Sequence, residues 1–92
     1  MYEIKLGNKF RKSFKRISRS GTFESQAFDQ IISLLIEEHE LMGRFGDHPL
    51  RGDSSDLREC HVAGDCLLIY KIEHENRLVR LIDIGNHANL FE

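Results

Sequence analysis

The fold is decided by residues 57–84, which read LRECHVAGDCLLIYKIEHENRLVRLIDI. Residues 66–73 open with an unbroken apolar run, which is typical of a central strand covered on both faces. Residues 57–62 and 77–84 flank it as two further strand-like runs, the second with alternating apolar and polar positions. The short polar segments between the runs favour tight turns. The stretch therefore predicts three antiparallel strands joined by hairpins.

One more strand and a helix precede this sheet at the start of the chain. Residues 2–6 alternate apolar and polar side chains, which predicts a strand with one buried face. Asn8 can cap a helix that starts near Lys9 and ends in the polar stretch around Gly21. The apolar stripe of that helix comprises Phe10, Phe14 and Ile17.

A second helix is expected over residues 23–41, where apolar positions repeat at helical spacing. Its stripe comprises Phe28, Ile31, Ile32, Leu35 and Ile36, continued by Met42. Residues 43–56 lack periodicity and indicate a loop, and residues 88–91 indicate a short tail. The predicted order is β-α-α-β-β-β, an α+β domain with two N-terminal helices packed on a small, mostly antiparallel sheet.

Length and composition indicate a single domain covering residues 1–92. Hydrophobic residues make up 40% of the chain and charged residues 30%, a balance that excludes the disordered class. No apolar run approaches the roughly 18 residues of a membrane span, and the N-terminus lacks the apolar core of a secretory signal. Cys60 and Cys66 cannot supply a disulfide framework, so we expect free thiols in a reducing, cytoplasmic compartment.

Charge is segregated along the chain, although the formal net charge is only −2. Residues 1–19 hold seven basic residues and one acid, whereas residues 20–92 hold six basic residues and fourteen acids. The basic end predicts contact with a polyanion or an acidic partner through the first helix. Three of its basic residues, Lys12, Lys15 and Arg16, are candidates for substrate binding, and a solvated helix face is the alternative.

Three of the five histidines sit where a predicted strand meets a loop. They are His48, His61 and His87, and Asp65 lies in the turn four residues after His61. Because histidine titrates near neutrality, such a cluster suits general acid–base chemistry. A histidine taken alone is more often a partly buried, hydrogen-bonded side chain, and only the three together near the sheet ends give the two interpretations equal weight. The other two, His39 and His74, have acidic neighbours and are expected at the surface.

A zinc site is the competing interpretation of this region, because Cys60, His61 and Cys66 lie close in sequence. Neighbouring residues of a strand point to opposite faces, so Cys60 and His61 cannot easily share one ion, and Cys60 suits the core. The chain also has no C-x-x-C pair and no glycine-rich phosphate loop. We therefore expect neither a metal nor another cofactor.

Metal-free cleavage of RNA needs the residue types that this chain offers. One group takes the proton of the ribose 2′-hydroxyl, cations stabilise the charged phosphorane, and an acid protonates the departing 5′-oxygen. The need for the 2′-hydroxyl makes such a reaction specific for RNA.

Four segments together resemble a known protein family. They are DHPLRG (47–52), LRECHVAGD (57–65), LLIYK (67–71) and GNHANLF (85–91). This series is similar to the YafQ branch of the RelE/ParE superfamily, the toxins of type II toxin–antitoxin modules. The N-terminal half agrees in length and helix content but carries few diagnostic residues.

The resemblance implies an mRNA endonuclease that cuts on the ribosome and is held inactive by a cognate antitoxin, in a toxin–antitoxin complex of higher order. It also implies a RelE-like α+β fold. Carried over position by position, His87 corresponds to the general acid, and His48 or Asp65 to the base or its orienting partner. His61 would position or stabilise the scissile phosphate, and Phe91 would stack beside a base.

Two positions depart from the family pattern. Many relatives carry an arginine four residues before the last histidine, where it would neutralise phosphate charge, and here that residue is Asp83. Arg80 should point to the opposite face of its strand unless a bulge intervenes, so Arg58 or Arg51 would have to bind the phosphate instead. Cys66 stands where some relatives have a tryptophan, which removes a stacking surface.

Two other functions stay open on this evidence. A ParE-like or catalytically weakened relative would act by binding a protein; Asp83 favours that interpretation, and the three retained histidines argue against it. A plain RNA-binding domain would use only the basic first helix.

Overall fold

The computed structural model describes residues 1–37, 45–50 and 56–91, with residues 89 and 91 as backbone only. The described part holds three helices and five strands. In chain order they are β1 (Glu3–Leu6), α1 (Asn8–Ile17), α2 (Ser25–Ile36), β2 (His48–Pro49), β3 (Arg58–Ala63), β4 (Cys66–Glu73), β5 (Leu78–Gly85) and α3 (His87–Phe91).

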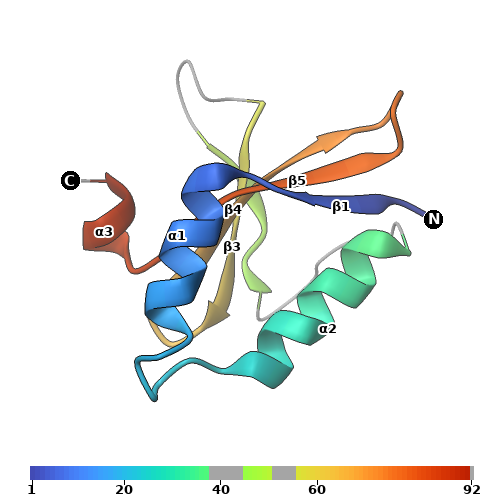
Figure 1. Cartoon of the computed structure of the whole chain (residues 1–92). Helices are drawn as coiled ribbons and strands as arrows, with labels where there is room; N and C mark the ends of the chain where they lie inside the picture. Colours follow the sequence, from blue (N-terminus) through green and yellow to red (C-terminus); the bar gives the residue numbers. More distant parts are fainter. Residues whose placement is uncertain (38–44, 51–55, 92) are drawn as a thin grey trace.

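The strands form one sheet in the order β1-β5-β4-β3-β2, which can be followed in Figure 1. β1 runs parallel to β5, and the other neighbouring pairs are antiparallel. The predicted α+β architecture with a mostly antiparallel sheet is therefore confirmed. β4 lies in the middle, and residues 67–70 are all buried, as the apolar run predicted.

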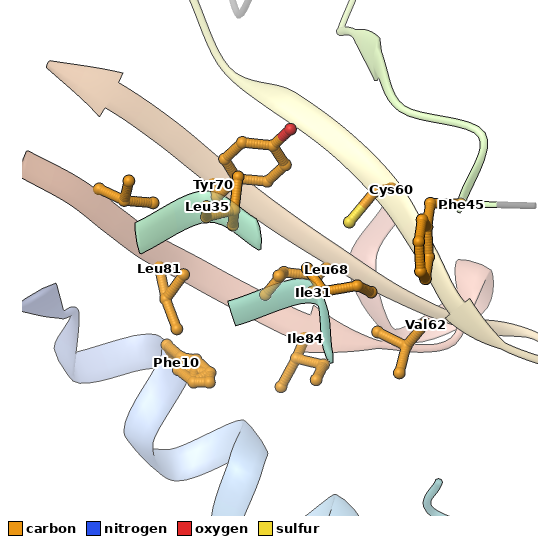
Figure 2. Close-up of a cluster of buried hydrophobic side chains, with 11 residues drawn as sticks. Phe10, Ile31, Leu35, Phe45, Cys60, Val62, Leu68, Tyr70, Leu81 and Ile84 are labelled. Carbon is orange, nitrogen blue, oxygen red and sulfur yellow. The ribbon is translucent and has the colours of Figure 1, made fainter. Parts of the chain in front are cut away.

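α1 and α2 cover one face of the sheet, with α1 against β5 and α2 against β3. Figure 2 shows the core between them, where Phe10 of α1 and Ile31 of α2 lie over the strands and Phe45 lies beside Cys60. Burial of each large apolar side chain contributes roughly 1.5–3 kcal/mol to stability. No helix in the described part of the chain is long and apolar enough to span a membrane.

A β-bulge in β5 changes the alternation of its side chains. The extra residue is Ile82, because Leu81 and Asp83 are opposite consecutive residues of β4. Arg80 and Asp83 therefore point to the same face of the sheet, although they are three residues apart. The expectation of opposite faces is wrong, and the bulge that it allowed as an exception is the arrangement found.

The start of α1 also differs from the sequence expectation. Gly7 is its N-cap residue, Asn8 is already helical, and no side chain caps the helix. The Gly7 N–H donates to the Leu81 carbonyl oxygen at 3.0 Å, and a Cβ on Gly7 would come within 3.0 Å of that oxygen. The close approach of the chain to β5 thus favours a residue without a side chain where the helix begins.

Other element boundaries differ as well. α2 is shorter than the predicted 23–41 and ends with Glu37 as its C-cap, while Met42 lies outside the described residues. The predicted loop contains β2, and the predicted tail forms α3. Within β1, Ile4 packs against the core, but Leu6 is 45% exposed and does not extend the buried face.

Candidate active site

Four residues from four adjacent strands form a row across the sheet, on the face opposite α1 and α2. They are His48, Glu59, Ile69 and Asp83, which are successive partners in the strand register. Because paired residues share a face, we call the side that carries this row the histidine face. Glu59 and Asp83 are only 7% and 4% exposed. Buried carboxylates need partners, and each of these two has one.

Glu59 is paired with His48, whose Nε2 lies 3.1 Å from Oε1 of the carboxylate. The other ring nitrogen, Nδ1, lies 3.1 Å from the carbonyl oxygen of Pro49. A carbonyl oxygen only accepts hydrogen bonds, so Nδ1 carries a hydrogen and donates it. Nε2 is then the nitrogen that can gain or lose a proton, and Glu59 accepts its hydrogen when it is protonated.

His61 belongs to the next row of the histidine face, opposite Leu67 of β4, which in turn pairs with Gly85 of β5. The exposed imidazole lies against the backbone of Gly46, where an added Cβ would stand 2.9 Å from Cδ2 of His61. Gly46 also has a φ of 54°, a conformation that favours glycine. The backbone conformation favours glycine there, and any Cβ at this position would push the His61 ring aside.

His87 is the exposed first residue of α3 and follows Gly85 by two positions. Gly85 lies in the row of His61, two strands away, which corresponds to roughly 10 Å between their Cα atoms. The structure therefore places His48, His61 and His87 at one end of the sheet, within two adjacent rows and the segment that follows them.

Asp83 is paired with Lys9 of α1, whose Nζ lies 3.3 Å from Oδ2 of the carboxylate. The other oxygen, Oδ1, accepts a hydrogen bond from the Ile84 N–H at 2.9 Å. The Lys9 side chain is 74% exposed and that of Asp83 only 6%, so the ammonium group lies on the solvent side of the pair. Asp83 is thus a compensated carboxylate, held by α1.

Arg58 lies on the core side of β3, opposite Tyr70, and is bound to Asp47. Nε of Arg58 donates to both carboxylate oxygens of Asp47 at 3.2 Å, and Nη2 donates to Oδ2 at 2.8 Å. The Tyr70 hydroxyl donates to Oδ1 of the same carboxylate. The hydrogen bond with Asp47 raises the pKa of Arg58. The pKa of Tyr70 is raised first by burial and then by the hydrogen bond that its own hydroxyl donates to Asp47.

The predicted role of Arg58 in phosphate binding does not agree with this placement. Strand alternation directs Arg58 to the face opposite His61, and its guanidinium is held by Asp47. Because Asp47 immediately precedes His48, the bond fixes the segment that enters β2. Arg58 is therefore a structural residue that supports the position of His48.

Asp65 lies in the exposed β3–β4 turn and lines a cavity of about 370 Å³ between this turn and the α1–α2 connection. Arg16 and Asn86 line the same cavity. Lys12 and Lys15 are exposed on α1 and do not line it. Of the three basic candidates on α1, Arg16 is the one that shares a cavity with a predicted catalytic residue.

The two cysteines are free, and Cys60 is fully buried in the core, as predicted. Burial raises the pKa of Cys60 to about 12, and burial together with nearby Asp65 raises that of Cys66 to about 11. Both groups are therefore thiols at neutral pH. Within the ranges that the structure describes, no three His, Cys, Asp or Glu side chains are grouped to hold a metal ion.

The structure does not describe the side chains of some residues to which the sequence analysis assigned a role or position. Arg51 and His39 are outside the described ranges, and Phe91 is described by its backbone only, so their roles stay predictions. His74 is exposed, as expected, and its Nδ1 lies 2.8 Å from the hydroxyl of Tyr2.

Three residues of the site were missed by sequence reasoning. Glu59 precedes His61 by two positions, and this spacing on a predicted strand was a signal that both share a face. Gly46 resembles any loop glycine in sequence. Lys9 comes to Asp83 from the other end of the chain, a contact that only the tertiary structure reveals.

Comparison with known proteins relates this chain to bacterial toxins. A family model described as "Bacterial toxin of type II toxin-antitoxin system, YafQ" matches residues 2–92. The mRNA interferase toxin YafQ of Escherichia coli K12 is 31% identical over 90 residues, which cover 97% of this chain and 84% of that protein.

Solved structures agree with this match. A metal-bound toxin from Helicobacter pylori superposes with a TM-score of 0.89 at 33% identity, covering 99% of this chain and all of that one. The E. coli DinJ–YafQ complex contains a chain that matches with a TM-score of 0.86 at 29% identity, with full coverage of both chains. This chain therefore belongs to the YafQ family of bacterial type II toxin–antitoxin toxins.

Proposed function

We propose that this protein is an mRNA interferase, which cleaves mRNA on the ribosome in the cytoplasm by metal-free general acid–base catalysis. Its family and the name of its E. coli relatives support the reaction class. The observation that carries the chemistry is the gathering of His48, His61 and His87 around the histidine face. Membership of the wider RelE/ParE superfamily, which the motifs suggest, is part of the same proposal.

In the proposed reaction the ribose 2′-oxygen attacks the adjacent phosphorus while the bond from phosphorus to the 5′-oxygen breaks. A base takes the 2′-hydroxyl proton, and an acid gives a proton to the departing 5′-oxygen. The products are a 2′,3′-cyclic phosphate and a 5′-hydroxyl. Cations and hydrogen-bond donors of the site stabilise the negative charge that builds on the phosphorane.

His48 is the better candidate for the base, because Nδ1 is fixed by Pro49 and Nε2 is left to exchange the proton beside Glu59. Asp65, in the hairpin turn, suits a role in holding substrate. His87 is the proposed acid, and His61 the contact to the scissile phosphate. Stacking of Phe91 beside a base is carried over from the family pattern.

A cognate antitoxin is the proposed protein partner, as in the DinJ–YafQ complex of the E. coli relative. We expect it to cover the basic surface of α1, formed by Lys12, Lys15 and Arg16, with an acidic or amphipathic segment that orders on binding. The assembled complex is expected to be of higher order. The same basic residues, together with Arg51, are the proposed contacts to RNA when the antitoxin is absent.

Induction of the chain in bacteria tests the function. The unmodified protein should halt translation and shorten cellular mRNAs, whereas His87→Ala should do neither. His74→Ala is the matched control, because His74 is an exposed histidine in the β4–β5 turn. Growth arrest by both the unmodified protein and His87→Ala, with mRNAs intact, would overturn the cleavage proposal and favour action through protein binding.

A further inference from the structure

The row of the histidine face carries a buried acid near each of its two ends, and each acid holds an exposed basic side chain. At the β2 end, Glu59 holds His48, whose side chain is 53% exposed. At the β5 end, Asp83 holds Lys9. Both acids belong to the same row of the sheet. The reaction proposed above uses the first pair and leaves the second without a function.

We propose that Lys9, held in place by Asp83, binds the phosphate backbone of RNA at the β5 end of the histidine face. The inference rests on the proposed cleavage of mRNA and adds a residue to it. Lys9 is the group that touches the substrate, and Asp83 is a positioning residue that acts through Lys9.

The strand register places this pair beside the histidines. Asp83 is one row from Gly85 and His61, so the Cα atoms of Asp83 and His61 are roughly 12 Å apart at ordinary strand spacing and rise. The ammonium group of Lys9, which lies beside the Asp83 carboxylate, and the imidazole of His61 can therefore contact one phosphodiester group between them. His87 follows Asp83 by four residues, so the pair also adjoins the proposed acid.

The orientation of the pair lets it attract a phosphate although its net charge is zero. The Asp83 carboxylate is buried, and the Lys9 ammonium group lies 3.3 Å from it toward solvent. A phosphate that arrives from solvent meets the ammonium group first, and attraction at the shorter distance exceeds repulsion from the carboxylate behind it. The ion pair also restricts the long side chain before RNA binds, which reduces the ordering cost of binding.

Other described cations around this row are placed differently. Arg80 and Lys71 lie farther along the sheet, and each is paired with an acid of its own. Arg58 lies on the opposite face. Among the Lys and Arg side chains in the described ranges, Lys9 is the one paired with a member of the row.

Cleavage of a ribosome-bound mRNA by purified variants tests the proposal. Lys9→Gln should lower the rate roughly tenfold, which is less than the loss for a donor in a water-excluded site because Lys9 is exposed. Lys9→Arg should retain most of the rate. Arg11→Gln is the matched control, because Arg11 is an exposed cation of the same helix that no described contact ties to the row, and it should leave the rate unchanged.

A double-mutant cycle tests whether Asp83 positions Lys9 or has a merely structural role. Asp83→Asn should lower the rate, and combining it with Lys9→Gln should add nothing to the loss caused by Lys9→Gln alone. The salt dependence of binding to a single-stranded RNA should also weaken in Lys9→Gln, by about 0.7 in the slope of log affinity against log salt. A merely structural pair would leave that slope unchanged.

Two results would overturn the proposal in distinguishable ways. If Lys9→Gln cleaves and binds RNA as the unmodified chain does, while His87→Ala is inactive, Lys9 has no role and the proposed mRNA cleavage still stands. If the folded, unmodified chain fails to cleave, the proposed function fails and takes this inference with it.

Discussion

The backbone of Gly46 touches the imidazole of His61, so closely that no Cβ atom fits between them. The contact connects the loop before β2 with the second row of the histidine face. It limits the orientations of a side chain that is otherwise exposed to solvent.

Gly46→Ala should therefore lower mRNA cleavage roughly tenfold by displacing the His61 ring, since small misplacements in a site are costly. Gly21→Ala is the matched control: Gly21 also has a positive φ, 78°, but a Cβ there meets nothing within 4 Å. Both variants should lose about 1 kcal/mol of stability from backbone strain, measured by urea unfolding. Equal cleavage rates in the two variants would contradict the positioning role of Gly46.

Because Glu59 contacts His48, substitutions of these two residues should have non-additive effects on the cleavage rate. Glu59→Gln keeps the volume of the side chain but removes its charge, and it should lower the single-turnover cleavage rate about tenfold, a part of what a general base contributes. In a His48→Ala background the same change should have no further effect. Glu75→Gln, an exposed acid in the β4–β5 turn, serves as the control. An additive loss would show that Glu59 acts independently of His48.

Because Arg58 is held by a bidentate bond to Asp47, replacing Arg58 should lower the stability of the fold and leave the contacts to RNA phosphates unchanged. Arg58→Lys keeps the charge but not the paired geometry, and it should lower the free energy of unfolding by roughly 1–3 kcal/mol. The salt dependence of RNA binding should stay as in the unmodified chain, because Arg58 lies on the other face of the sheet. A weaker salt dependence would restore the phosphate-binding role that the sequence suggested.

Raised pKa values predict that the fold weakens at alkaline pH. The pKa of Cys60 is raised from 9.0 to about 12 and that of Cys66 from 9.0 to about 11, mainly by burial. A group with a raised pKa in the folded state stabilises the fold fully below its unfolded pKa and loses this contribution as the pH rises toward the folded value. The free energy of unfolding should be flat up to about pH 8 and fall between about pH 9 and 11.

Urea unfolding at a series of pH values measures this decline. Cys66→Ser removes one of the titrating groups and should make the decline less steep. A free energy of unfolding that is constant up to pH 11 would contradict the prediction.

Charge reversal on α1 tests the proposed antitoxin contact. Replacing Lys12, Lys15 and Arg16 by glutamate should slow association with the antitoxin and flatten its salt dependence, because electrostatic steering acts mainly on the association rate. Arg77→Glu in the distant β4–β5 turn is the control. Association with unchanged rate and salt dependence would mean that this face of α1 contacts the ribosome or solvent instead.

The parts of the fold that follow from local patterns could be predicted from sequence. The apolar run of β4 required burial on both faces, and the hairpins around it left only an antiparallel arrangement. The apolar stripe of α1, which starts with Phe10, could also be predicted, because its residues repeat at helical spacing. β2 has two residues and exists only because it pairs with β3, so it has no pattern of its own.

The site could be predicted in its residue types but not in its pairing. His48, His61 and His87 stand out because histidines where strands meet loops are conspicuous. What each acid contacts depends on register, and a single extra residue, Ile82, moves Asp83 and Arg80 to one face. The contact of Arg58 could not be predicted either, because a basic residue in a sequence does not reveal that an aspartate eleven positions earlier binds it.

The parallel pairing of β1 with β5 has a consequence for the order of events during synthesis. β1 leaves the ribosome well before its partner strand, which spans residues 78–85, and Lys9 likewise leaves well before Asp83. Contacts of such long sequence separation form late, because the ends of a long loop must first meet. A nascent chain therefore cannot assemble the histidine face before residue 85 has emerged. An antitoxin that is already present can therefore meet the chain before the proposed active site is complete.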